Sequence, residues 1–298
     1  MKFLTALRQP TVRKLEQIGK VDIVVGVPTY FSADTVEHVI KVISEGLNRY
    51  FHNKTALIFI SDGGSTDDTR EVAKSVEITS LNQELIVAIY RGIPGKGSAI
   101  RAIFEAAKFL EAEAIALFDS DLRSITPEWI RNIIQPIYEG FDFVAPYYRR
   151  YKYDGTITNT IVYPMTRAMF GYDIRQPIGG DFGISPSLVR VCLEEDVWET
   201  DVARFGIDIW LTIMAITGEF NVCQTRLGAK IHNVKDPAKH LGKMFIQVVG
   251  TLFNMLEKYE RFWLTVKDIK QVPTFGEYVG IEPQPFNIDL NALIDYFK

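Results

Sequence analysis

Cysteine, histidine and long apolar runs are scarce in this chain. Only Cys192 and Cys223 occur among 298 residues, so a disulfide framework is not indicated and a reducing cytoplasm is expected. The most apolar late run, residues 245–256, is too short to cross a bilayer, and no integral membrane segment is predicted. The first ten residues have a very short apolar patch before Arg8 and Pro10, which makes a poor signal peptide.

Positive charge is not in excess either. The formal net charge is −4 at pH 7, and the chain therefore has no basic footprint of the kind that binds nucleic acid. A hydrophobic content of 47% and a charged content of 23% are ordinary for a soluble globular enzyme. The length allows one large domain, or one domain with an appendage.

What the sequence does contain is a regular alternation of β-rich and helical segments. Short apolar runs predict buried strands at residues 21–27, 56–61, 84–89, 114–119 and 141–146. Apolar residues recur at helical spacing between them, at Val36, Val39, Ile40 and Ile43 and again at Ile100, Ile103, Phe104, Ala107 and Leu110. This alternation predicts an α/β fold with a mainly parallel sheet flanked by helices, which binds ligands at the carboxyl ends of its strands.

The second half is less regular until residue 236. Asp236 is a candidate cap and Pro237 lies in the first turn of a long helix. Its apolar stripe comprises Leu241, Met244, Phe245, Val248, Leu252, Phe253 and Leu256. The stripe predicts a core-facing helix, with a membrane-surface or dimer helix as the alternative. A further helix starts at Asp289.

Polar residues follow the first two predicted strands. Pro28 is expected to end the first strand, and Tyr30 could cover a flat ring or belong to a simple proline turn. Asp62 stands at the tip of the second strand, before two glycines. Its carboxylate could accept hydrogen bonds from a nucleobase or a ribose, or it could form an Asx turn.

The loop after the third predicted strand carries a lysine between two glycines. Lys96 lies between Gly95 and Gly97, just before a helix start, where backbone amides and a cation suit a phosphate. The segment does not match a P-loop, because a glycine follows the lysine. A solvated lysine in a turn would explain the pattern as well.

The fourth strand, in "AIALFDSDLRS", ends in two aspartates. Asp119 and Asp121 share a face because side chains alternate along a strand, and two like charges side by side call for a cation. Carboxylate oxygens at this position suit Mg²⁺ or Mn²⁺, while a capping and salt-bridging pair is the alternative. The order of the four loops favours a site for a nucleotide, a phosphate and a metal ion in one crevice.

These motifs resemble those of a known family. "VPTY", "SDGGSTDDT", "GKGSAI" and "FDSDL", in this order, resemble GT-A-fold nucleotide-sugar glycosyltransferases. "QPIGGDFGIS", "RFGIDIWLTIMAITG" and "KIHNVKD" are similar to retaining enzymes of the mannosylglycerate synthase and glucosyl-3-phosphoglycerate synthase type. The resemblance covers residues 21–256.

The resemblance implies a catalytic domain at 1–235, with a nucleotide-sugar half at about 21–145 and an acceptor half at about 146–235. Residues 236–298 would form a C-terminal helical extension packed on that domain.

The resemblance also implies roles for individual residues. The nucleotide-sugar site would comprise Pro28, Tyr30, Asp62, Lys96, Asp119, Ser120, Gly179, Gly180 and Asp181. Within it, Asp62 would contact the base, Lys96 the nucleotide or the diphosphate side, and Asp181 the sugar hydroxyls. Asp121 and His232 would bind the metal directly, with Asp119 holding the ribose or a metal-bound water. Thr158, Asp208 and Arg150 would lie at the acceptor, and Asp208 and Lys96 would be the catalytic residues.

Two arginines of the resembling enzymes are missing here. The chain has Ala145 and Thr156 at those positions. Arginine is the natural clamp for carboxylate and phosphate groups. Their loss counts against a simple glycerate or phosphoglycerate acceptor unless Arg149, Arg150 or Lys152 replaces the charge.

The expected activity is transfer of a hexose from a UDP-glucose or GDP-mannose type donor to a small polar acceptor such as glycerate or 3-phosphoglycerate. The resemblance implies dependence on Mg²⁺ or Mn²⁺ and retention of anomeric configuration. One alternative is an inverting transferase acting on a polyprenyl phosphate or a polysaccharide. Another is a catalytically silent nucleotide-sugar-binding protein. A homodimer is a further expectation, and no nucleic-acid partner is expected.

Overall fold

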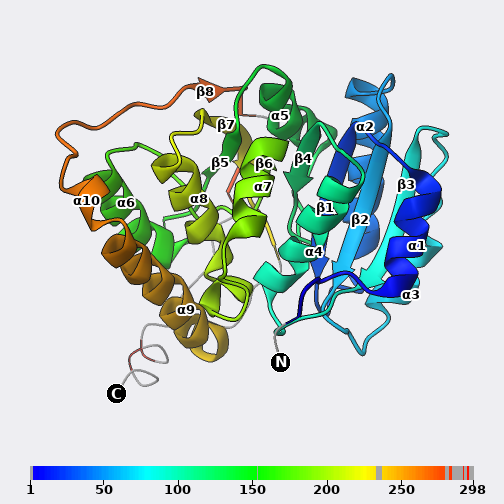
Figure 1. Ribbon diagram of the computed structural model, residues 1–298, viewed down its shortest axis with the longest axis horizontal. Helices are drawn as coiled ribbons and strands as arrows, with labels where there is room; N and C mark the ends of the chain where they lie inside the picture. The colour runs from blue at the N-terminus through cyan, green and yellow to red at the C-terminus, as the bar shows by residue number, and fades with distance from the viewer. Residues whose placement is uncertain are drawn as a thin grey trace.

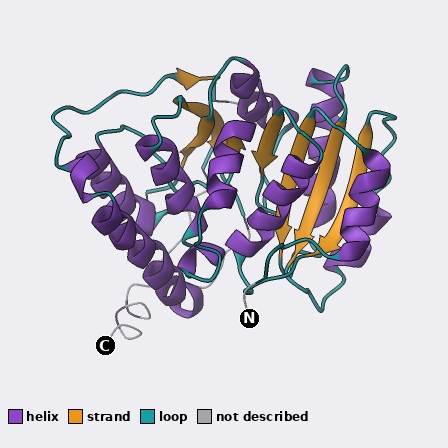
Figure 2. Cartoon of the chain, in the orientation of Figure 1, coloured by secondary structure: helices purple, strands orange, loops and turns teal. Residues whose placement is uncertain are grey.

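The computed structural model contains one eight-stranded sheet with helices on both faces (Figures 1 and 2). It describes residues 3–152, 154–232 and 237–278, together with Glu282, Pro283, Asn291 and Ile294. The predicted cap at Asp236 and the helix start at Asp289 lie outside these residues.

The elements follow the predicted alternation through the first half of the chain. The strands are β1 (Ile23–Thr29), β2 (Ala56–Asp62), β3 (Gln83–Ile89), β4 (Ala114–Leu117), β5 (Phe143–Arg149), β6 (Phe182–Ile184), β7 (Val222–Ala229) and β8 (Thr274–Phe275). The α-helices are α1 (Gln9–Ile18), α2 (Val36–Tyr50), α3 (Thr69–Ser75), α4 (Lys96–Phe109), α5 (Pro127–Tyr138), α6 (Tyr163–Phe170), α7 (Pro186–Glu194), α8 (Ile207–Thr217), α9 (Pro237–Lys258) and α10 (Glu260–Trp263). A π-helical turn, η1 (Thr158–Val162), precedes α6, and a 3₁₀ turn, η2 (Asp201–Ala203), precedes α8.

The direction of one strand decides which loops meet. The sheet order is β3-β2-β1-β4-β6-β5-β7-β8, and the neighbouring strands are parallel except where β6 pairs with β4 and β5. The predicted mainly parallel sheet is therefore confirmed. Because β6 runs the opposite way, its amino end lies at the edge where the other strands have their carboxyl ends. Residues just before β6 consequently meet residues that follow β4 and β7.

Two apolar clusters hold the helices to the sheet, one on each face. Val36, Ile40 and Ile43 of α2 are completely buried in one cluster, together with side chains of α3 and α5. Ile103 and Phe104 of α4 are buried in the other, which also includes residues of α7, α8 and α9. The predicted stripes are thus confirmed, and each fully buried side chain of this size contributes about 1.5–3 kcal/mol to folding.

The C-terminal part departs from a purely helical extension. In α9, Val248 and Leu252 are buried as predicted, whereas Phe245 and Phe253 are 41% and 53% exposed. Beyond α10 the chain returns to the sheet, where β8 pairs with β7. The predicted C-terminal helices are present as α9 and α10, and the segment after them adds an edge strand to the sheet. No described helix is long and apolar enough to cross a membrane.

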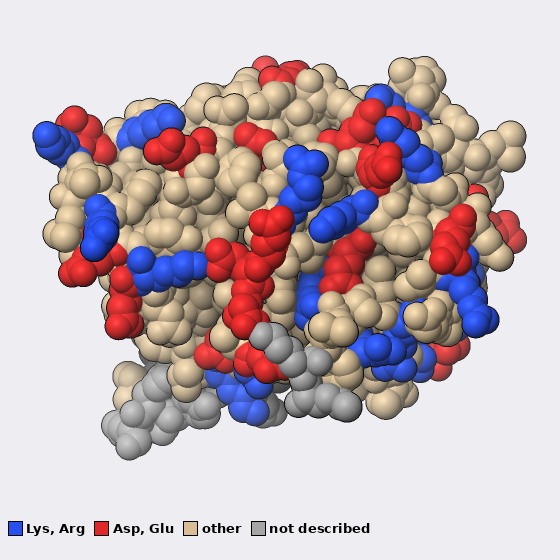
Figure 3. Space-filling view, in the orientation of Figure 1, with Lys and Arg blue, Asp and Glu red and all other residues tan. Residues whose placement is uncertain are grey.

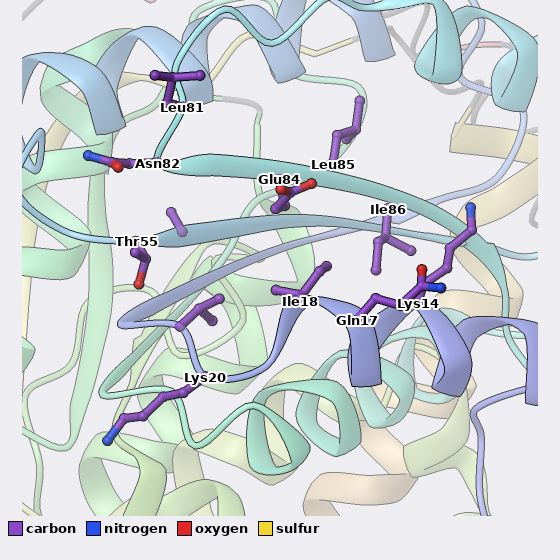
Figure 4. Close-up of a pocket in the computed structure, with 12 residues that line it drawn as sticks. Lys14, Gln17, Ile18, Lys20, Thr55, Leu81, Asn82, Glu84, Leu85 and Ile86 are labelled. Atoms are coloured by element: carbon purple, nitrogen blue, oxygen red, sulfur yellow. The ribbon is translucent and has the colours of Figure 1, made fainter.

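Away from the carboxyl edge of the sheet, the surface has mixed charge and one sizeable hollow among the described residues. Acidic and basic side chains lie interspersed over the face in Figure 3, in keeping with the small net charge. A hollow of about 510 Å³ lies between α1 and the amino-terminal parts of β2 and β3. Figure 4 shows Gln17 and Ile18 of α1 near Ile86 of β3 in this hollow. None of the residues predicted to bind a ligand lines it.

Candidate active site

Three of the predicted residues meet at the carboxyl edge of the sheet. Lys96 begins α4, Asp119 follows β4, and Asp208 lies in the first turn of α8. The Lys96 Nζ atom lies 2.9 Å from Asp119 Oδ1 and 3.1 Å from Asp208 Oδ1. A close packing contact sets this approach, because a Cβ on Gly97 would lie 1.8 Å from the Val202 carbonyl oxygen. The glycine after the lysine thus allows α4 to pack against η2.

Lys230 is a member of this site that the sequence analysis missed. It comes directly after β7, and its side chain is only 4% exposed. Its Nζ atom lies 2.6 Å from Asp119 Oδ2 and 3.0 Å from Asp181 Oδ2, and it donates to the Gly179 carbonyl oxygen at 2.8 Å. In this structure the charge of Asp119 is therefore balanced by two lysines, Lys96 and Lys230.

Burial and charge pairing set the ionisation of the cluster. Burial would raise the pKa of Asp119, but Lys230 and Lys96 outweigh it and hold that pKa well below its ordinary value. Burial would lower the pKa of Lys96, yet Asp119 and Asp208 raise it above the ordinary value. For Asp208 burial dominates and raises the pKa, although Lys96 opposes the shift. Both lysines are thus cations and Asp119 is an anion.

Asp181 and its two preceding glycines hold the cluster together. The backbone N–H of Asp119 donates to Asp181 Oδ1 at 2.8 Å, and the Tyr148 hydroxyl donates to Asp181 Oδ2. Gly180 has a φ of +89°, and a Cβ there would lie 2.3 Å from Asp119 Oδ2, so only glycine fits. Asp181 is completely buried, with both oxygens engaged. The burial and these hydrogen bonds do not support the expected contact of Asp181 with sugar hydroxyls. Instead, the Asp181 carboxylate positions Asp119 and Lys230.

Asp62, which the resemblance assigns to the base, forms hydrogen bonds within its own loop and with β1. Its Oδ2 accepts from the backbone N–H groups of Gly64 and Ser65, each at 2.8 Å, and its Oδ1 accepts from the Ser65 and Thr29 hydroxyls. The side chain is completely buried. The structure therefore favours the alternative of an Asx turn over direct contact with a base.

The other residues of the predicted nucleotide side differ in exposure. Pro28 lies inside β1, which continues to Thr29, so it does not end the strand as expected. Tyr30 is 62% exposed and lies over Gly63, whose added Cβ would be 3.0 Å from the ring. Ser120 is buried, with its Oγ 2.7 Å from Ser32 Oγ. Of these three, Tyr30 is the side chain exposed enough to cover a flat ring.

The two predicted metal ligands come from adjoining segments. Leu122 and His232 form an antiparallel bridge, and the Arg123 N–H donates to the Ile231 carbonyl oxygen at 2.8 Å. The backbone segments that carry Asp121 and His232, far apart in the sequence, therefore lie side by side. In the ranges that the structure describes, no three His, Cys, Asp or Glu side chains form a metal-binding group. A carboxylate and an imidazole fit a divalent ion that takes its remaining ligands from a diphosphate and water.

A small recess lies beside the cluster, at Gly179, whose carbonyl oxygen accepts a hydrogen bond from Lys230. Its lining residues are Arg150, Gly155, Thr158, Asn159, Gln176, Ile178 and Gly179. Thr158 and Arg150 were both predicted at the acceptor, whereas Asp208 lies apart from the recess and pairs with Lys96. Thr158 begins the π-helical turn, a rare element that often marks functional sites.

Two of the arginines near the recess form ion pairs with carboxylates of the chain. Arg150 pairs with Asp154, at 2.7 Å, and the exposed Arg149 pairs with Glu282. Arg175, which the sequence analysis overlooked, donates from Nη2 to Asn159 Oδ1 at 2.8 Å. Its buried Nη1 has no hydrogen-bond partner among the described residues. Arg175 is thus the cation near the recess without a carboxylate partner in the described part of the chain.

The open α/β sheet with helices on both faces is the fold of GT-A glycosyltransferase structures. Residues 24–185, more than half of the chain, match the model of the family described as Glycosyl transferase family 2. The chain belongs to this family and is a glycosyltransferase. The predicted fold class and the resemblance are confirmed.

The chain is also similar to curated relatives and solved structures that are named as sugar–phosphoglycerate synthases. Glucosyl-3-phosphoglycerate synthase of Mycolicibacterium paratuberculosis is 27% identical over 267 residues, which cover 82% of this chain and 75% of the relative. The enzyme of that name from Mycobacterium tuberculosis, solved with Mn²⁺, UDP and glucosyl-3-phosphoglycerate, superposes with a TM-score of 0.62 at 22% identity, covering 94% of this chain and 97% of that one. Mannosyl-3-phosphoglycerate synthase of Rubrobacter xylanophilus gives a TM-score of 0.58 at 22% identity, with coverages of 84% and 78%. At these identities the solved structures show the shared fold.

Proposed function

We propose that this glycosyltransferase moves a hexose from a UDP-sugar to a small hydroxy acid of the glycerate type, with retention and with Mg²⁺ or Mn²⁺. The observation that carries the proposal is the meeting of Lys96, Lys230, Asp119 and Asp208 at one edge of the sheet. The segment of Asp121 is bridged there to that of His232 through Leu122. A relative with this fold was solved with Mn²⁺, UDP-glucose and phosphoglyceric acid, which supports the choice of donor and acceptor class.

The charge balance of the site supports a divalent ion. The buried cluster combines two lysines with three carboxylates, those of Asp119, Asp181 and Asp208. Asp121 adds a further carboxylate two residues from Asp119. When bound by Asp121 and His232, the ion would neutralise negative charge on the leaving diphosphate. Lys96 would hold the phosphate side, and Tyr30 would cover the base.

Asp208 and Lys96 would act on the acceptor hydroxyl. Lys96 holds Asp208 at 3.1 Å, so the carboxylate orientation is fixed before an acceptor arrives. Its main contribution would be to position the hydroxyl near the anomeric carbon. Among the residues described around the cluster, the remaining carboxylates of Asp119 and Asp181 are engaged by lysines, which leaves no evident nucleophile. The resemblance implies retention, and without an enzymatic nucleophile retention would require the acceptor hydroxyl to attack from the face that the leaving phosphate departs from.

An acidic acceptor agrees with the charges near the recess. Arg150 is neutralised by Asp154, but Arg175 lies behind Asn159 without a carboxylate partner in the described chain. Its positive charge favours an acceptor that carries a carboxylate. Arg175 can thus take the part of the two arginines that Ala145 and Thr156 replace. A cytoplasmic location and a homodimer stay predictions from the sequence, which fractionation and sedimentation would test.

Replacing Asp121 with asparagine tests the metal assignment. Asp121→Asn is expected to weaken Mn²⁺-dependent binding of UDP-glucose about 10- to 100-fold, because a neutral amide is a poorer ligand for a hard cation. Titration calorimetry with Mn²⁺, and again with a chelator, measures this change. Asp268→Asn, at an exposed position, is the control and should leave binding unaltered. Mn²⁺-dependent affinity that survives in Asp121→Asn would rule out Asp121 as a ligand.

A further inference from the structure

The recess on the acceptor side is sized for a single small group. Its free volume is about 10 Å³, close to what one water molecule needs. Gly179 lines it, and the carbonyl oxygen of the same residue accepts the hydrogen bond from Lys230. The recess therefore adjoins the charged cluster, and it has room for one oxygen-sized part of an acceptor.

Gln176 lines this recess, and one of its side-chain polar atoms has no hydrogen-bond partner among the described residues. The residue is 5% exposed, and its Nε2 donates to the Tyr148 carbonyl oxygen at 3.3 Å. This bond fixes which way the amide faces, because the reverse orientation would set two carbonyl oxygens against each other. Among the residues that the structure describes, none donates to Gln176 Oε1. A buried carbonyl without a donor is unfavourable, so a ligand that supplies a proton donor gains affinity there.

The chemistry of the neighbours indicates what that ligand group is. Arg150 lines the recess, but its charge is paired with Asp154 at 2.7 Å. The Asn159 amide is also engaged, since its Oδ1 accepts from Arg175 and its Nδ2 donates to the Asp154 carbonyl oxygen. An ionised phosphate or carboxylate oxygen has no proton to donate to Gln176 Oε1. A neutral hydroxyl does, and it has the right size.

We propose that the recess binds one free hydroxyl of the acceptor, distinct from the hydroxyl that receives the sugar, and that Gln176 Oε1 accepts the hydrogen bond from it. Gln176 is then a specificity-determining residue, which selects an acceptor with an unphosphorylated second hydroxyl. This inference rests on the proposed function, since it assumes a hydroxy-acid acceptor. A site that hydrogen-bonds a hydroxyl discriminates strongly against the analogue that lacks it.

D-Glycerate and D-lactate form the pair that tests the inference. They share the carboxylate and the 2-hydroxyl, and D-lactate lacks only the 3-hydroxyl. Wild-type enzyme with UDP-glucose and Mn²⁺ is expected to show a kcat/KM about 10- to 100-fold higher for D-glycerate. In Gln176→Met the ratio should fall to near one, through a higher KM for D-glycerate and little change for D-lactate. Thr166→Val removes another buried hydroxyl without a partner among the described residues and should keep the wild-type ratio.

The possible outcomes separate this inference from the function on which it rests. Equal kcat/KM for the two acceptors in wild-type enzyme would overturn the inference and leave the function standing, whether or not Gln176→Met folds. A wild-type preference that persists in Gln176→Met, or a preference for 3-phosphoglycerate over D-glycerate, would also overturn it. Transfer to none of the three acceptors would instead contradict the proposed function.

Discussion

Lys230→Met is expected to destabilise the protein and to abolish most of its transfer activity. The substitution leaves Asp119 and Asp181 buried with one cation fewer, and breaking such a buried pair costs about 3–5 kcal/mol of folding free energy. Loss of Asp119 positioning should also lower kcat by at least about 100-fold. Urea denaturation measures the first effect, and turnover of UDP-glucose measures the second.

The control for this variant is an exposed lysine. The Lys20 side chain is 62% exposed and lies 3.9 Å from Glu111. Lys20→Met should therefore change stability by less than about 0.5 kcal/mol and leave activity intact. If Lys230→Met were as stable and active as Lys20→Met, Lys230 would not be the cation that organises the site.

Asp208→Asn is expected to lower kcat about 100- to 1000-fold while donor affinity stays close to that of the wild type. The amide keeps the shape of the side chain but loses the charge that pairs with Lys96 and orients the acceptor hydroxyl. Donor affinity should persist because Asp121 and His232 are assigned to the metal, and Lys96, assigned to the diphosphate, keeps its pairing with Asp119. Steady-state kinetics with both substrates varied, together with UDP-glucose calorimetry, separates these effects.

Asp201→Asn provides the comparison for Asp208→Asn, since Asp201 precedes α8 and forms only a half-exposed pair with Arg204. It should alter kcat little. A loss in Asp208→Asn confined to the KM of the acceptor would show that Asp208 binds the ground state and transition state equally.

The carboxyl edge of the sheet could be predicted because its signals are local. Buried strands of four to seven residues, each followed by polar loops, indicate a parallel sheet wherever helices separate them. Lys96, Asp119 and Asp121 follow such strands, so their common location was foreseeable. Their exact partners were not, because pairing depends on contacts between distant segments.

Lys230 and Arg175 show why the rest could not be predicted. A lysine just after a strand normally lies in solvent, and Lys230 is buried because Gly179 and Asp181, which precede the antiparallel β6, lie within hydrogen-bond reach of its Nζ atom. The three residues of β6 are too few for any periodicity to reveal its direction. For Asp62 the sequence allowed two interpretations, a contact with a base and an Asx turn. The four hydrogen bonds that its carboxylate accepts favour the turn.

Nuclear magnetic resonance of the product tests the central claim most directly. The enzyme is incubated with UDP-glucose, D-glycerate and Mn²⁺, and the anomeric proton of the product is observed. We expect an α-linked glucosyl glycerate, formed at the rate of UDP release and suppressed by a chelator. A β-linked product, or release of free glucose with no glycoside formed, would contradict it.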